Sequence, residues 1–132
     1  MSPEKAIRVG IVGSRRRNDF HDRQLLYNFL AKYVEKGYPI HLVSGGCPKG
    51  ADRFAENIAE ELGLGITVHK PDKRLLPAKP LYHDYVKMYH GRNTLIAEDC
   101  QILVALPSRD RKGGTEDTIT KANALGRTII IL

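Results

Sequence analysis

The residues from Ser44 to Asp52 form the first grouping whose types and spacing could do chemistry. The segment reads Ser-Gly-Gly-Cys-Pro-Lys-Gly-Ala-Asp and separates an apolar run at 40–43 from a helical pattern at 51–62. Glycine lets the backbone approach a ligand, and the first amides of a helix are unpaired at the positive end of its dipole. The turn therefore favours an anion such as phosphate, with a ligand-free turn as the alternative. Its candidate ligand-binding residues are Ser44, Gly45, Gly46 and Gly50.

Two more glycine turns have the same character. Gly13-Ser14-Arg15 ends an apolar run at 7–12, and Gly113-Gly114-Thr115 opens a helical pattern after an apolar run at 102–106. An arginine at the end of a strand presents a planar fork of donors to phosphate or carboxylate. The threonine adds a hydroxyl beside the helix amides. For the neighbouring Arg16 and Arg17, solvated surface charge is the better explanation.

Several carboxylates fall at the same predicted rim. Asp52 lies in the first turn of one helix, and Glu116 and Asp117 lie in the first turn of another. Such acids favour the helix dipole without any ligand. They could instead hydrogen bond a ribose or base, stabilise positive charge or act as a general base. Arg92-Asn93 lie on the helix that leads back to 102–106 and could reach the rim from the side.

Cysteine and histidine chemistry has weaker support. Cys47 lies near a helix start with Lys49 close by, which could lower its pKa, but no histidine is placed by sequence to activate it. We interpret it as a passive loop residue. The five histidines show no metal-ligand spacing, and we expect His41 and His69 to be structural residues in strands. We expect neither a metal nor a resident cofactor.

The elements that position these residues alternate along the chain. We predict strands at 7–12, 40–43, 66–68, 102–106 and 128–132, and helices that end at Gly37, at Gly63 with Gly65, and at Gly126. A further helix at 81–97 follows a long loop at 71–80, and Gly91 could break or kink it. Continuously apolar strands indicate an α/β fold with a doubly wound parallel sheet, ordered 3-2-1-4-5, with two helices on each face.

The whole-chain properties limit the function classes. At 132 residues the chain is predicted to form one domain, and no apolar run has the roughly 20 residues that a membrane span needs. The first residues lack the apolar segment of a signal peptide, so we expect a cytoplasmic protein. A net charge of +6 suggests an anionic partner.

Taken together, these motifs resemble the SLOG superfamily of Rossmann-like domains, which includes the LOG phosphoribohydrolases and the DNA-processing protein DprA. The resemblance is closest to a small single-domain branch and covers nearly the whole chain. It rests on Gly13-Ser14-Arg15, Ser44-Gly45-Gly46, Gly50-Ala51-Asp52, Arg92-Asn93, Asp99 and Gly113-Gly114-Thr115. It implies a nucleotide or nucleotide-derived phosphorylated ligand at the rim and a homodimer.

The resemblance also implies two alternative functions. In the LOG enzymes an arginine, matched here by Arg92, and a glutamate cleave the N-glycosidic bond of a nucleoside monophosphate. The glutamate position holds Thr118 here, with Glu116 and Asp117 beside it, so hydrolysis is the second choice. Binding of single-stranded nucleic acid, as in DprA, is the third. Tyr82, Tyr85 and Tyr89 fall at helical spacing, which core or dimer packing explains better than base stacking.

Overall fold

A computed structural model describes residues 6–132 of the chain. The strands are β1 (Ile7–Gly13), β2 (Ile40–Ser44), β3 (Gly65–Val68), β4 (Ile102–Leu106) and β5 (Thr128–Ile131). The helices are α1 (Phe20–Glu35), α2 (Ala51–Leu62), the short 3-10 helix η2 (Lys73–Leu75), α3 (Tyr82–Asp99) and α4 (Gly114–Ala124). Strand and helix alternate as the sequence predicts.

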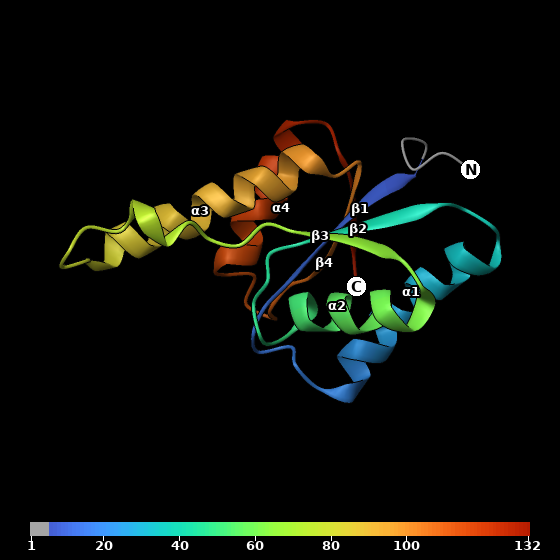
Figure 1. Ribbon diagram of the computed structural model, residues 1–132. Helices are drawn as coiled ribbons and strands as arrows, with labels where there is room; N and C mark the ends of the chain where they lie inside the picture. Colours follow the sequence, from blue (N-terminus) through green and yellow to red (C-terminus); the bar gives the residue numbers. More distant parts are fainter. Residues whose placement is uncertain (1–5) are drawn as a thin grey trace.

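The five strands form one parallel sheet in the order β3-β2-β1-β4-β5, which confirms the predicted topology. Figure 1 shows α1 and α2 on one face of this sheet and α3 and α4 on the other. Each face has its own apolar core, one centred on Ile11, Leu42 and Ile58, the other on Val43, Ile96 and Leu103. Within residues 6–132, no helix combines the length and apolar character that crossing a membrane demands.

Local sequence signals set most of the element ends. Asp19 caps α1, and its side chain accepts a hydrogen bond from the amide of Asp22. Gly63 ends α2 in the left-handed conformation, with φ of 67°. Gly65, which we predicted to help end that helix, instead begins β3 and pairs with His41, whose ring lies where a Cβ on Gly65 would be. His69 follows β3 rather than lying within it.

Helix α3 is continuous through Gly91, so the predicted break or kink is wrong. The position is exposed, and a Cβ there would meet no atom within 4 Å. A glycine inside a helix costs only about 0.5–1 kcal/mol relative to alanine. Burial of Asn93, Ile96 and Ala97 on the same helix outweighs that cost.

Replacement of Gly91 by alanine should therefore stabilise the protein by about 0.5–1 kcal/mol. The alanine restricts the unfolded chain and meets open space in the folded one. Urea unfolding of the variant and the parent protein would measure the difference. A loss of stability would show that Gly91 is needed for a contact or conformation that the helix does not display.

The first half of α3 and the segment before it project from the sheet as an arm, which we define as residues 70–89 (Figure 1). The base of the arm is fastened by Asp99, which accepts hydrogen bonds from Arg8 Nε at 2.8 Å and lies 2.8 Å from His69 Nε2. Although burial opposes it, these contacts hold the pKa of Asp99 below its usual value. Asp99 therefore joins the end of α3 to β1 and to His69, the residue just before the arm.

Candidate ligand-binding site

A cleft of about 630 Å³ opens beside the carboxyl end of β1. Its size is typical of a small-molecule site, and its place beside the β1–β4 switch point is where doubly wound sheets bind ligands. Four segments line it: the turn after β1, the β2–α2 connection, one side of α3, and the start of α4. The three predicted glycine turns thus come together from distant parts of the chain.

The predicted site residues divide into two groups. Nine of them line the cleft: Gly13, Ser14, Arg15, Asp52, Arg92, Asn93, Gly113, Gly114 and Thr115. Six lie outside its lining: Ser44, Gly45, Gly46, Gly50, Glu116 and Asp117.

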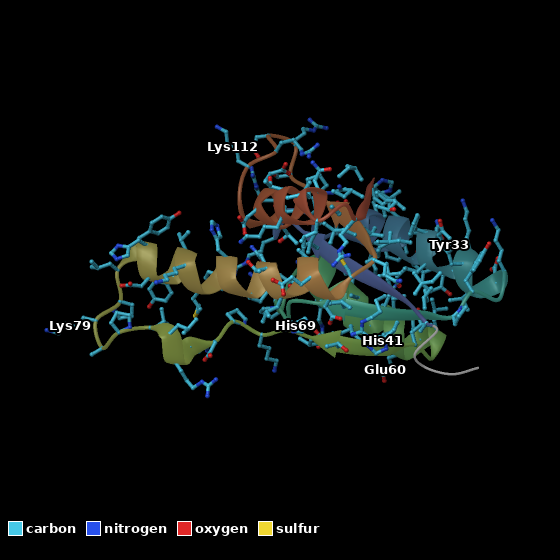
Figure 2. All side chains as sticks on the ribbon, turned by 90° about the horizontal axis from the view of Figure 1, so that it is seen from above. Tyr33, His41, Glu60, His69, Lys79 and Lys112 are labelled. Carbon is cyan, nitrogen blue, oxygen red and sulfur yellow. The ribbon has the colours of Figure 1, made fainter. Side chains whose placement is uncertain are left out.

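Positive charge dominates the cleft. Arg15, Arg16, Arg92 and Lys112 line it, whereas among the described residues Asp52 is the one carboxylate in the lining. Figure 2 shows Lys112 on the loop before α4. Cys47 has the largest effect on the pKa of Arg15 and raises it, as the Tyr89 hydroxyl also does, although burial opposes them. All three residues line the cleft. An anionic ligand would find several cations at one end of the cleft.

The start of α4 adds backbone donors to this cationic end. Gly113, its N-cap residue, has φ of 109° and makes no side-chain cap, and Gly114 and Thr115 line the cleft. The first amides of a helix have no partners within the helix, so an uncapped start facing a cleft can donate to an anion. Asn93 Nδ2 donates to the Gly114 carbonyl at 3.3 Å and holds this turn against α3.

The Ser44–Asp52 segment supports the cleft from below. Arg92 Nη1 donates to the Gly45 carbonyl at 2.6 Å, and a Cβ on Gly45 would lie 2.5 Å from that nitrogen. Gly46 and Gly50 have positive φ, and a Cβ on either would press on Val68 or on the Ser14 carbonyl. These glycines therefore allow close packing beneath the site. Ser44 is fully buried below them.

Asp52 is a buried carboxylate at the floor of the cleft. It is 9% exposed, and its Oδ2 accepts a hydrogen bond from the Cys47 amide at 3.0 Å. Burial raises the pKa of Asp52, while the Cys47 amide and the charge of Arg92 oppose that rise. The carboxylate is thus positioned both to brace the loop and to meet a ligand.

This shift gives a pH-dependent prediction for Asp52→Asn. Because the folded pKa lies above the ordinary value of 3.8, ionisation of Asp52 reduces stability as the pH rises above 3.8, and the loss is complete above the folded pKa. The asparagine can still accept from the Cys47 amide. At neutral pH the variant should therefore be at least as stable as the parent protein. The difference should shrink as the pH falls toward 3.8, and urea unfolding across this range would measure it.

Asp110→Asn is the control with the opposite sign. Hydrogen bonds lower the pKa of Asp110 to about 2, and the bond from Arg16 has a larger effect than the bond from Ser108. Its ionised form therefore adds stability at neutral pH, and this contribution is lost as the pH falls toward 2. We expect Asp110→Asn to lose stability at neutral pH. The same loss in Asp52→Asn would contradict the prediction and show that the Asp52 carboxylate stabilises the fold.

The two acids of α4 face other partners. Arg111 donates to both carboxylate oxygens of Glu116, at 2.8 and 3.0 Å. Asp117 accepts from Asn93 Nδ2 at 3.2 Å and from Lys121 Nζ at 2.7 Å. Both carboxylates are satisfied within the protein, beside the cleft rather than in its lining.

The tyrosines of α3 form a wall of the cleft, which the sequence interpretation missed. Tyr82, Tyr85 and Tyr89 all line it. Tyr82 is 84% and Tyr85 41% exposed, so packing in the core does not explain these two, and dimer packing stays a prediction. Arg92 lies over the Tyr89 ring at 5.7 Å. A stripe of aromatic residues on a helix that follows a long loop was the available signal.

The sequence profile of the YspA, cpYpsA-related SLOG family (YAcAr) matches residues 7–75, just over half of the chain. The chain belongs to this SLOG family. The matched part of this YAcAr chain includes the turn after β1 and the Ser44–Asp52 segment. No curated protein matches the sequence at a significant level.

Two solved structures share the fold of this YAcAr protein. One is a molybdenum cofactor binding protein from the phototrophic bacterium Rippkaea orientalis, 14% identical, with a TM-score of 0.69. That alignment covers 96% of this chain and 76% of the other. The second is the structural genomics target TM1055, 18% identical, with a TM-score of 0.65, covering 93% of this chain and 72% of the other. At these identities the likeness shows the Rossmann-like fold alone.

Proposed function

We propose that this protein binds a nucleotide, or a phosphorylated ligand derived from one, in the cleft beside β1. The observation that carries the proposal is the pairing of a cationic end with an aromatic wall in one cleft. Arg15 and the uncapped start of α4 lie at one end, and Tyr85 and Tyr89 lie along α3. Phosphate suits the cationic end, and a heteroaromatic base suits the tyrosine wall.

The arrangement also suggests how the ligand is oriented. The phosphate would accept hydrogen bonds from Arg15 and from the amides of Gly114 and Thr115, with Lys112 at the rim. The base would stack on Tyr85 or Tyr89, and Asp52 would accept from a ribose hydroxyl or a base amine. One structural neighbour binds a molybdenum cofactor, which is in keeping with ligand binding on this fold.

Thermal unfolding in the presence of a nucleotide panel tests the proposal. A ligand at about 100 times its Kd adds about 2.7 kcal/mol of stability, a rise in Tm of about 5–10 °C for a chain of this size. Nucleoside phosphates should give this rise, whereas unphosphorylated nucleosides and inorganic phosphate alone should give much less. Added salt should weaken the effect because charge attraction is screened. A flat response across the panel would refute the proposal.

Hydrolysis of nucleoside monophosphates is the second candidate for the same cleft. The observation in its favour is that Arg92 and the buried Asp52 line the cleft together. Asp52 would then supply the carboxylate that Glu116 and Asp117, paired with Arg111 and Lys121, do not present to the cleft. Chromatography of nucleotides incubated with the protein would show free base if this reaction occurs. Recovery of the bound nucleotide intact would support binding without hydrolysis.

Homodimer formation is part of the proposal. Ile131 on the edge strand β5 is 46% exposed, and an uncovered strand edge favours pairing with another chain. Sedimentation equilibrium of the purified protein would give its mass in solution. A mass of 14.8 kDa would show a monomer.

A further inference from the structure

The aromatic wall is longer than a single base requires. Tyr82, Tyr85 and Tyr89 recur at intervals of three and four residues, so they share one side of α3. From Tyr89 to Tyr82 the helix rises about 10 Å. Tyr89 lies under the guanidinium of Arg92, whereas Tyr82 is the first residue of α3 and the lining residue farthest out along this helix.

Tyr82 has no structural role that accounts for it. Its side chain is 84% exposed, and no hydrogen bond or aromatic pairing with another described residue involves it. An exposed large aromatic residue that lines a cleft is a feature of binding surfaces. A ligand whose phosphate contacts Arg15 and whose base stacks on Tyr89 or Tyr85 would leave Tyr82 without a partner.

The cleft also ends at Tyr82. Among the described residues, its lining does not continue to the tip of the arm, where Lys79 lies (Figure 2). The volume of about 630 Å³ is about twice the lower end of the range for small-molecule sites, about 300 Å³. The lining from Arg15 to Tyr82 is therefore long enough for more than one ring.

We infer that the cleft takes a ligand with two heteroaromatic bases joined through phosphate, the outer base stacking on Tyr82. This inference rests on the proposed function and narrows its ligand class to dinucleotides. The linkage could be a 3′–5′ phosphodiester, as in a fragment of nucleic acid, or a 5′–5′ pyrophosphate. In both linkages, negatively charged phosphate joins the two bases.

Calorimetric titration of the whole protein would test this inference with three probes. They are thymidine 5′-monophosphate, the 5′-phosphorylated dithymidylate, and a 5′–5′ pyrophosphate-linked dithymidine. Stacking of a base on an aromatic side chain contributes about 1–3 kcal/mol, so at least one dinucleotide should bind about 5- to 150-fold more tightly than the monophosphate. The dinucleotide that binds more tightly identifies the linkage.

Substitution of Tyr82 assigns that gain to its ring. Tyr82→Ala should remove the gain for the dinucleotide and leave the affinity for the monophosphate unchanged. Tyr82→Phe keeps the ring and should keep the gain. Tyr38→Ala is the matched control, because Tyr38 is 49% exposed and lies outside the cleft. Tyr82 is exposed enough that its removal should not impair folding.

Three results would overturn the inference. One is equal affinity for the monophosphate and both dinucleotides, which would leave the proposed function standing. Another is a continued rise in affinity from the dinucleotide to a 15-residue thymidine strand, which would indicate a nucleic-acid polymer as the partner. The third is an unchanged affinity accompanied by a changed mass in sedimentation of Tyr82→Ala, which would assign Tyr82 to an interface between copies. If none of the three probes bound and the nucleotide panel gave no rise in Tm, the proposed function itself would be refuted.

Discussion

Replacement of Arg15 by alanine is expected to weaken nucleotide binding by one to two orders of magnitude while leaving the fold intact. Hydrogen bonds to charged groups contribute about 1.5–3 kcal/mol, and each 1.4 kcal/mol is a factor of about ten in affinity. Arg15 lies in the lining between Cys47 and Tyr89, and no ion pair with a carboxylate of the described residues occupies its guanidinium. Its donors are therefore available to a phosphate.

The measurement is calorimetric titration of the variant and the parent protein with the best-binding nucleotide. Arg74→Ala is the matched control, since Arg74 is 91% exposed, paired with Asp72 and outside the cleft. Arg15→Lys should recover only part of the affinity because an ammonium group lacks the planar fork. Equal affinities for Arg15→Ala and Arg74→Ala would show that the phosphate lies elsewhere.

Gly45→Ala is expected to weaken nucleotide binding by displacing Arg92, although Gly45 itself does not line the cleft. The new Cβ would lie 2.5 Å from Arg92 Nη1, so the guanidinium must leave the Gly45 carbonyl that it now contacts at 2.6 Å. The same Cβ would press on Asp52 Oδ2 at 3.0 Å. Overpacking of this kind costs about 1–3 kcal/mol of stability. We expect that loss together with at least a tenfold loss of nucleotide affinity.

A double-mutant cycle assigns the effect to Arg92. If Gly45→Ala acts by displacing that guanidinium, its effect on affinity should be small in a protein that already carries Arg92→Ala. Gly91→Ala provides the control, because it adds the same methyl group beside Arg92 on α3 but meets no atom within 4 Å. Additive losses in the double variant would contradict this mechanism.

The fold of this chain was largely determined by local patterns in its sequence. Continuous apolar runs such as 102–106 indicate strands buried on both faces, and they alternate with amphipathic helices that glycines such as Gly63 end. Only a few topologies connect such units with right-handed crossovers, so the strand order followed. Gly91 was misjudged because helix propensity is a weak term, which the burial of α3 against the sheet overrides.

The site depended more on tertiary structure. Sequence could place Arg15 and Gly114 at the same rim, since the carboxyl ends of neighbouring parallel strands meet there. Which face of each loop meets the cleft depends on contacts between segments far apart in the chain. Arg92 bonds to Gly45 across the fold, and Arg111 draws Glu116 out of the lining.

The sequence by itself determined the sheet, its order and the three turns that approach one another at its rim. Tertiary structure alone decided that the tyrosines of α3 line the cleft, because helical spacing shows that residues share a face but not what that face contacts. The sequence spacing and the structure both put Tyr82, Tyr85 and Tyr89 on one face of α3. Only the path of the arm beyond the edge of the sheet turns that side into a wall of the cleft.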